Sequence, residues 1–336
     1  MIKAPVIIIG CPRSGTTLLY SILSEVSTLW SIGYESKAII EAHHPPETKN
    51  WSSGALSAFD LTPASQAYML DAFEINAAPG SFWRRVNGLR KRLRSFSGWQ
   101  AIKRHGRSTQ SGSAVSSAIP QQGLNSIRKM VKLYQRLTPT KATQTIRLLE
   151  KTPENCLRLP FLLALFPDAR IIYLTRDGRS NINSLMEGWR QPHLFPGYQV
   201  PEPIKIPGDI RGRWAFTLIP GWRELTASPL EEVCAWQWVR CNEAVLAHRE
   251  KTDGQVPYLT IRYEKLIQDP ALILNEIAAF IRVDFVQELS RYAKELPKVN
   301  MVSKPEQEKW RRENGKAIER VLPIIRPTME KLGYKM

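Results

Sequence analysis

A short apolar run near the start of the chain, followed at once by a glycine-bounded loop, most constrains the fold. Residues 6–9 read Val-Ile-Ile-Ile, residues 10–17 read Gly-Cys-Pro-Arg-Ser-Gly-Thr-Thr, and residues 18–26 have a helical pattern. A strand, such a loop and a helix in this order present backbone N–H groups and a helix N-terminus to a phosphate. The spacing is that of the Walker A motif G-x-x-x-x-G, but Thr16 stands where that motif has its lysine. We therefore predict a phosphate-binding loop whose ligand is not ATP.

A second candidate phosphate site lies at residues 170–184. A β-rich run ends at Arg176 and passes into a polar helix start rich in capping residues, and Ser184 follows about two helical turns later. A guanidinium binds a phosphate through paired hydrogen bonds, and a hydroxyl can donate to another phosphate oxygen. Taken alone, Arg176 could instead pair with Asp177, with Ser184 at the surface.

A third segment, residues 145–155, has the pattern of a strand that ends in Lys151 and is followed by Thr-Pro. Pro153 then marks the first turn of a helix start, and we expect the helix to run over residues 155–166. By itself, a lysine at the end of a strand is commonly just a solvated side chain.

Together and in this order, the three segments resemble sulfotransferases that use 3′-phosphoadenosine 5′-phosphosulfate (PAPS), in particular the bacterial and tyrosylprotein type. The resemblance implies that the 3′-phosphate is bound by Arg176 and Ser184. It places Lys151 at the oxygen that bridges sulfate and phosphate, where a cation offsets charge developing on the leaving group. Lysine and backbone N–H groups would fill the role of Mg²⁺ in kinases, so no metal is expected. The residues implied to hold the 5′-phosphosulfate are Arg13, Ser14, Gly15, Thr16 and Thr17.

The general base is predicted from residues 31–37, Ser-Ile-Gly-Tyr-Glu-Ser-Lys, which resemble the tyrosylprotein-sulfotransferase segment that carries a catalytic glutamate. Transfer to a hydroxyl requires a group that takes its proton, and Glu35 would serve. Lys37 could help hold the substrate or the glutamate. The alternatives to Glu35 as base are His43, His44 and, less strongly, Glu41.

The last third of the chain carries two further resemblances. Residues 256–266 are similar to the family's strand followed by R-Y-E-x-L, whose tyrosine, here Tyr263, lies beside the cofactor in some members. Residues 303–311 match the family's closing loop, in which a serine and basic residues cover the phosphates. The match implies a catalytic role for Ser303 at the sulfate, and phosphate contacts for Lys304 and Lys309.

The expected fold class is α/β, a three-layer P-loop fold whose central parallel sheet is flanked by helices, in a single sulfotransferase domain over residues 1–336. Strands alternate with helices, which argues for a parallel sheet covered on both faces. The strand ends that carry Gly10, Lys151 and Arg176 should then meet at one edge of the sheet. A Pro/Gly-rich excursion at residues 191–220 resembles the family's mobile substrate loops. The remaining elements are predicted as a strand at 171–174, a helix at 179–187, a long helix at 229–250, a strand at 258–261 and a helix at 271–280.

The net charge of +16 is concentrated in one segment. Residues 75–149 contain fifteen Lys and Arg and no Asp or Glu, so the rest of the chain carries 16 − 15 = +1. We expect residues 75–145 to be a basic helical insertion, with a helix over 124–137, that forms part of the acceptor-facing or membrane-facing surface. Three interpretations stay open: attraction of an anionic acceptor, peripheral contact with an anionic membrane, or a solvated face without a partner.

Composition limits the compartment and the partners. There is no apolar run of 18 residues, the first strand begins almost at once, and the four cysteines form no CxxC pair. We expect a cytoplasmic protein with reduced cysteines, no signal peptide and no metal, and a small-molecule, glycan or lipid acceptor. A P-loop nucleotide kinase is the alternative enzyme, although GK[ST] is missing. A basic nucleic-acid or membrane-surface binder is the alternative without catalysis, but no nucleic-acid partner is expected, because no DNA or RNA motif accompanies the charge.

Overall fold

The fold is that of a computed structural model, which describes residues 1–80, 82, 145–207, 212–284, 287–293, 295–297, 299 and 308–335. The predicted basic insertion lies outside the described residues, except for 75–80, 82 and 145. Ser303 and Lys304 lie outside them as well.

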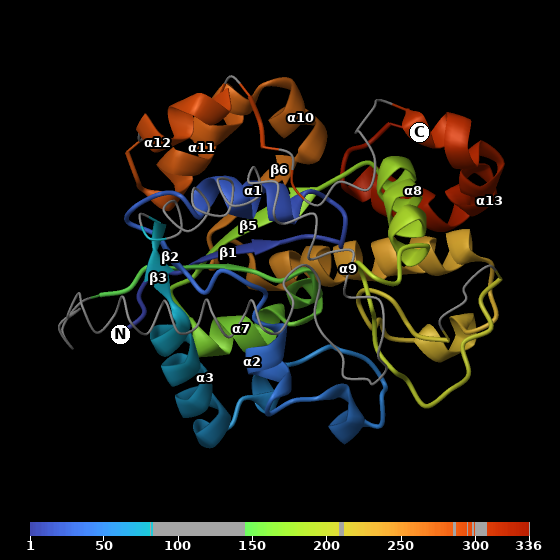
Figure 1. The fold of residues 1–336 in the computed structure, drawn as a ribbon, viewed down its shortest axis with the longest axis horizontal. Coiled ribbons are helices and arrows are strands. Elements are labelled where there is room, and N and C mark those ends of the chain that lie inside the picture. The colour runs from blue at the N-terminus through green and yellow to red at the C-terminus, as the bar shows by residue number, and fades with distance from the viewer. Residues whose placement is uncertain are drawn as a thin grey trace, which may run out of the picture.

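A mostly parallel sheet forms the centre of the described structure (Figure 1), with strand order β3-β2-β4-β1-β5-β6. β1 is the middle strand and pairs in parallel with β4 on one side and β5 on the other. β2 and β6 continue the sheet in parallel, and β3 alone among the described strands is antiparallel. The strands are β1 (Val6–Ile9), β2 (Trp30–Ser31), β3 (Ala78–Pro79), β4 (Leu148–Lys151), β5 (Arg170–Thr175) and β6 (Tyr258–Arg262).

Helices cover both faces of the sheet. Because successive strand residues point to opposite sides, alternate residues of β1 pack against different helical layers. Val6 and Ile8 pack with the layer of α1 (Thr16–Leu23), α10 (Tyr263–Gln268), α11 (Pro270–Ile281) and α12 (Gln287–Ser290). Ile7 and Ile9 pack with the layer that contains α7 (Leu159–Leu165) and α9 (Leu230–Thr252). In Figure 1 these two layers lie above and below the strands. The predicted three-layer α/β class is confirmed, and the uninterrupted apolar run of β1 is explained by burial on both faces.

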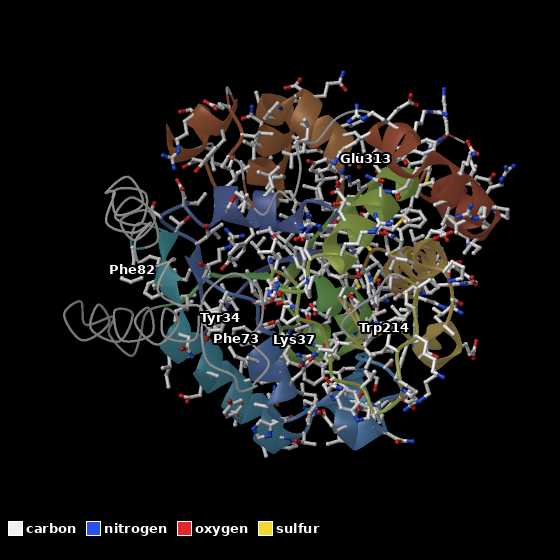
Figure 2. All side chains as sticks on the ribbon, turned by 45° about the vertical axis from the view of Figure 1, so that its right-hand side comes forward. Tyr34, Lys37, Phe73, Phe82, Trp214 and Glu313 are labelled. Atoms are coloured by element: carbon white, nitrogen blue, oxygen red, sulfur yellow. The ribbon has the colours of Figure 1, made fainter. Side chains whose placement is uncertain are left out.

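The second layer is extended by α8 (Gly178–Trp189) and α13 (Lys309–Lys331), which pack on each other and on α9. Phe73 of α3 and Trp214 of the excursion, both labelled in Figure 2, are fully buried. The other short elements are α2 (Lys37–Glu41), α3 (Pro63–Asn76), η1 (Pro46–Lys49), η2 (Ala58–Asp60), η3 (Pro153–Leu157), η4 (Trp222–Leu225) and η5 (Arg291–Ala293). None of the described helices is both long and apolar enough to cross a bilayer.

The prediction of one continuous helix over residues 155–166 is wrong. The structure has the 3₁₀ turn η3 and then, after Arg158, the separate helix α7. Pro160 lies in the first turn of α7 and has no N–H to extend a helix from upstream, so the helical ladder starts again there. The excursion forms neither a helix nor a strand in its described residues 191–207 and 212–220, apart from one antiparallel bridge between Tyr198 and Trp214.

Gly10, at the end of β1, should tolerate no side chain. A Cβ there would lie 2.4 Å from the carbonyl oxygen of Leu174 on β5. Because this contact is with backbone, we expect Gly10→Ala to lower the free energy of unfolding by about 2 kcal/mol, the usual range for overpacking. Gly315→Ala is the control, since no atom lies within 4 Å of its Cβ position in α13, and it should be neutral or stabilise by about 0.5–1 kcal/mol. Urea unfolding measures both, and equal stability of the two variants would contradict the prediction.

Candidate functional site

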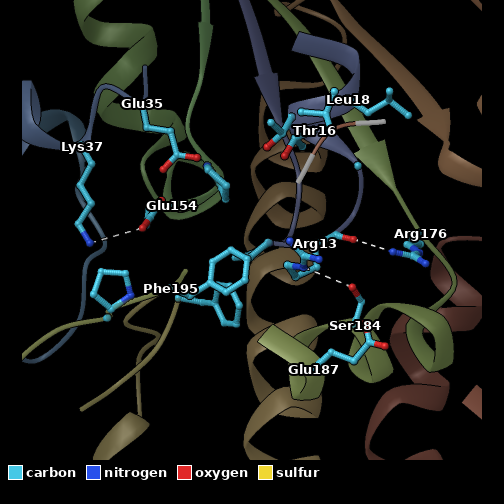
Figure 3. A pocket seen from close by; sticks show the side chains of 18 of the residues that line it. Arg13, Thr16, Leu18, Glu35, Lys37, Glu154, Arg176, Ser184, Glu187 and Phe195 are labelled. Carbon is cyan, nitrogen blue, oxygen red and sulfur yellow. Dashed lines mark hydrogen bonds and ion pairs between the residues drawn. The ribbon is translucent and has the colours of Figure 1, made fainter. Parts of the chain in front are cut away.

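The ends of three adjacent parallel strands form one side of a cavity of about 760 Å³. The glycine-bounded loop follows β1, Lys151 is the last residue of β4, and Arg176 follows β5. Arg13, Thr16, Arg176 and Ser184 line this cavity (Figure 3), as do Gly15 and Thr17. The expected meeting of the three strand ends is therefore seen.

The loop after β1 adopts a backbone that few residues allow. Arg13 has φ +71°, and Gly15, the N-cap residue of α1, has φ +100°. A Cβ on Gly15 would lie 2.4 Å from the ring of Tyr263, so only glycine lets the loop pass this ring. A non-glycine residue at positive φ, as at Arg13, is a feature that concentrates at ligand-binding sites. The loop and the N-terminus of α1 together form a concavity of the kind that binds anions.

Two arginines converge at the far side of this loop. The Arg13 Nε donates to the Ser184 hydroxyl at 3.3 Å, and the Arg176 Nη1 donates to the Arg13 carbonyl at 2.8 Å. The Arg176 guanidinium also stacks over the Tyr263 ring, 4.6 Å from its centroid. Burial, together with the nearby charge of Arg176, lowers the pKa of Arg13 to about 10. Two cations held this close favour the binding of an anion between them.

The alternative interpretation of this segment, in which Arg176 pairs with Asp177, does not hold in the structure. Asp177 instead pairs with Arg179 and caps α8 by accepting from backbone N–H groups. Ser184 is buried rather than exposed, and the Nε atom of Arg176 is buried with no hydrogen-bond partner among the described residues. An unsatisfied buried guanidinium N–H is costly, so this atom is poised to donate to a ligand.

Lys151 lies beneath the cavity and connects the loop after β1 to Glu35. Its Nζ donates to Glu35 Oε1 at 2.6 Å and to Thr17 Oγ1 at 3.2 Å. Lys151 is only 4% exposed, so it is not a solvated lysine at the end of a strand. Glu35 itself lines the cavity.

The other candidates for the base are placed differently. The His43 ring packs on Tyr68, with centroids 4.4 Å apart, and the His44 ring meets Phe161 edge-on at 5.2 Å. Neither histidine lines the cavity. Glu41 does line it, but its Oε1 already accepts from Arg158 at 2.7 Å and from the Tyr198 hydroxyl at 2.8 Å.

Lys37 belongs to a buried charge network at the same end of the cavity. Its ammonium lies 3.4 Å from the centroid of the Tyr198 ring and 3.6 Å from Glu154 (Figure 3). Burial alone would lower the pKa of Lys37, but Tyr198, Glu154 and Glu41 outweigh it and raise the pKa. Burial would likewise raise the pKa of Glu154, yet Lys37 and Arg158 hold it below its usual value.

Of the remaining predicted site residues, some line the cavity and others do not. Tyr263 lines the cavity between Gly15 and Arg176. Lys309 also lines it, and its Nζ contacts Glu187 and Glu313, the latter at 3.2 Å. Ser14 is buried in the loop, and its hydroxyl has no hydrogen-bond partner among the described residues. Ser303 and Lys304 lie outside the described residues.

Several cavity residues were not predicted. Ser180, Asn183 and Glu187 line the cavity from the same face of α8 as the predicted Ser184, and their spacing relative to it could have revealed them. Phe195, Tyr198 and Phe216 come from the excursion, which gave no such periodic signal.

Residues 5–199, more than half of the chain, match the family model described as "Sulfotransferase family". A Caenorhabditis elegans protein named "Putative protein-tyrosine sulfotransferase" is 27% identical over 209 residues, which cover 62% of this chain and 64% of that protein, less than two thirds of its length. Sulfotransferase STF9 from Mycobacterium avium is 16% identical, with a TM-score of 0.48 over 100% of this chain and 78% of that one. A retinol dehydratase in complex with androsterone and PAP is 14% identical, with a TM-score of 0.38 over 98% and 81%. The two structural similarities are too distant to carry a functional argument.

Replacing Lys37 by methionine should destabilise the protein in a pH-dependent way. At pH 7 the change removes the ammonium that forms an ion pair with the buried Glu154 carboxylate, and we expect a loss of about 3 kcal/mol. In the wild type the lowered pKa of Glu154 adds stability above its usual pKa, and this stability is lost as the pH falls. In the variant, burial drives the pKa of Glu154 upward, so the deficit should shrink between pH 7 and pH 5. Urea unfolding at both pH values measures the effect.

The matched control is Lys49→Met, which breaks the ion pair with Asp60, where the Lys49 side chain is 35% exposed. Exposed pairs contribute less than about 1 kcal/mol. A Lys37→Met deficit as small as that of the control, or one that does not vary with pH, would contradict the prediction.

Proposed function

This chain belongs to the sulfotransferase family, and on that premise we propose that it transfers a sulfuryl group from PAPS to an acceptor hydroxyl by in-line displacement. The observation that carries the proposal is the position of Lys151, which touches both the loop after β1, at Thr17, and the carboxylate of Glu35. A donor bound in the loop and an acceptor beside Glu35 would meet at this lysine.

The nucleotide is proposed to bind through its two phosphate ends. The loop residues Arg13, Ser14, Gly15, Thr16 and Thr17 would hold the 5′-phosphosulfate. Arg176 and Ser184 would hold the 3′-phosphate, which supplies an acceptor for the Nε of Arg176, an atom with no partner in the described part of the chain. Tyr263 and Lys309, both at the cavity wall, would complete the site. Ser303 and Lys304 are proposed as further contacts by resemblance alone.

In the proposed reaction the acceptor oxygen attacks sulfur while the bond between sulfur and the bridging oxygen breaks. Glu35 takes the hydroxyl proton, and its contact with the Lys151 ammonium holds its carboxylate in place. The electron pair of the broken bond stays on the bridging oxygen of PAP. An ammonium has three N–H donors, and Lys151 uses two of them here, so one is available to stabilise that oxygen.

Aromatic side chains line much of the cavity, and the ring centroid of one of them, Phe195, lies 4.9 Å from the guanidinium carbon of Arg13. Phe195 and Phe216 pack with ring centroids 5.1 Å apart, and Trp51 and Tyr198 also line the space. This supports an acceptor whose hydroxyl is carried beside an apolar face, in a small molecule, a glycan or a lipid. The single-domain organisation and the surface role of residues 75–145 remain predictions. The P-loop kinase and the basic binding protein are disfavoured by the family match.

Nucleotide binding tests the first half of the proposal. Isothermal calorimetry with PAP should detect binding to the wild type. Arg176→Ala should weaken the affinity about 10- to 100-fold, because a hydrogen bond to a charged group contributes about 1.5–3 kcal/mol. Arg179→Ala is the matched control, since Arg179 pairs with Asp177 and does not line the cavity. No heat from PAP with the wild type would refute PAPS as the donor.

Turnover tests the catalytic roles. A screen of carbohydrate, lipid and phenolic hydroxyls with radiolabelled PAPS identifies an acceptor that the wild type sulfates. Lys151→Ala and Glu35→Ala should each lower kcat on that acceptor at least ~10²-fold, the usual loss of an electrostatic or acid–base group, while PAP binding persists. Wild-type turnover in either variant would remove that residue from the mechanism.

A further inference from the structure

A buried polar cluster lies directly behind the Glu35–Lys151 pair, outside the cavity lining. It consists of Ser36, Glu150, Thr152 and Asn155, each at most 1% exposed. A glutamate in such a place is costly unless its oxygens are well hydrogen-bonded. Burial raises the pKa of Glu150, and hydrogen bonds from Thr152, Ser36 and Asn155 act in the opposite direction.

The hydrogen bonds in this cluster converge on Glu150, and the Ser36 and Thr152 hydroxyls also lie 3.1 Å apart. Glu150 Oε1 accepts from the Ser36 hydroxyl at 2.7 Å and from the Thr152 hydroxyl at 2.6 Å. Because the Thr152 proton is committed to Glu150, its oxygen is free to accept from the Ser36 backbone N–H at 2.7 Å. Asn155 Nδ2 donates to Glu150 Oε2 at 2.9 Å. Ser36 is thus held through both its backbone and its side chain.

Ser36 gives up a common local interaction to make these contacts. It is the N-cap residue of α2, where a serine hydroxyl usually accepts from a backbone N–H of its own helix. Here there is no such side-chain cap, and the hydroxyl donates to Glu150 on β4 instead. The serine therefore connects the loop to the sheet rather than stabilising its own helix.

Two neighbouring residues of the loop, Glu35 and Ser36, contact two neighbouring residues of β4. Glu150 and Lys151 follow each other on β4 and so point to opposite faces of the sheet. Glu35 contacts Lys151, and the next residue, Ser36, contacts Glu150. On the other side of Glu35, the Gly33 N–H donates to the Tyr20 hydroxyl of α1 at 3.1 Å. Glu35 is therefore held from both sides of the chain.

We propose that Ser36, Glu150, Thr152 and Asn155 form a positioning clamp that sets the distance between Glu35 and Lys151. None of the four touches the cavity, so the clamp acts through Glu35 and Lys151 and not on a ligand. The inference rests on the proposed function for its catalytic consequence, but the clamp itself is a property of the ligand-free protein.

Hydrogen exchange tests the clamp without any ligand. The Ser36 amide should exchange slowly in the wild type, and at least ~10-fold faster in Thr152→Val, which removes the oxygen that accepts from it. The matched control is Ser65→Ala, which alters another buried, hydrogen-bonded serine at the start of α3. Fast exchange in the wild type, or an equal effect of the control on the Ser36 amide, would overturn the clamp.

Steady-state kinetics test positioning. With the acceptor found in the PAPS screen, Ser36→Ala should lower kcat about 10-fold or more, and Glu150→Ala should lower it further. The KM for PAPS and the affinity for PAP should stay within about 2-fold, because the phosphate-binding residues are untouched. Ser65→Ala should leave kcat unchanged. An equal loss of PAP affinity and kcat in Ser36→Ala would indicate general disruption and overturn the proposal.

Glu150→Gln provides the rescue variant. Its amide oxygen can still accept from Ser36 and Thr152, and once the Asn155 side-chain amide turns over, its amide N–H can donate to Asn155 Oδ1, which is buried without a hydrogen-bond partner in the described structure. A clamp made of hydrogen bonds therefore predicts kcat within about 3-fold of the wild type for this variant. A loss as large as that of Glu150→Ala would mean that the charge matters rather than the clamp. If the wild type binds no PAP, the proposed function fails, whereas the exchange experiment still decides on the clamp.

Discussion

The parallel pairing of β4 and β5 with the central strand β1 is the constraint on which the rest of the structure depends. Parallel strands end at the same edge of a sheet, so three segments far apart in the sequence deliver their polar residues to one place. The apolar side chains of β1 make this arrangement stable, because both faces of the strand are buried beneath helices. A shift in the register of any one strand would move its terminal residue away from the shared edge.

Charge is distributed unevenly in the cavity that results. At the end near α8, Arg13 and Arg176 lie close to each other and concentrate positive charge. At the opposite end, Lys37 lies against Glu154, and Arg158 against Glu41, so the charges there are largely compensated. The Glu35–Lys151 pair lies at the base of the cavity and touches the loop after β1. We propose that an anionic donor binds at the end with the two arginines, and that the aromatic side chains lining the cavity accommodate the less polar part of the acceptor.

Several residues that position these groups adopt conformations or contacts that are locally unfavourable. Arg13 adopts a positive φ, Gly15 passes beneath the Tyr263 ring, and Ser36 gives up the capping of its own helix. Such departures from local preference persist only where the surrounding contacts determine the conformation. Here those contacts include the Arg176 hydrogen bond to the Arg13 carbonyl and the buried bonds to Glu150. Positioning in this protein is thus achieved by tertiary contacts that override local propensity.

The sequence by itself determined the segments of β1, β4, β5 and β6 but not those of the two-residue strands β2 and β3. It also determined the loop after β1 and the polar residues that end β4 and β5, because strand periodicity, glycine spacing and proline positions are local properties. It left the base open among Glu35, Glu41 and two histidines, and it missed both the break at Arg158 and the aromatic walls from the excursion. Only the tertiary structure brought Glu35 to Lys151, 116 residues apart in the chain, and turned Ser36 toward Glu150. Contacts between such distant residues are selected by packing and by the need to pair buried polar groups, which no local pattern encodes.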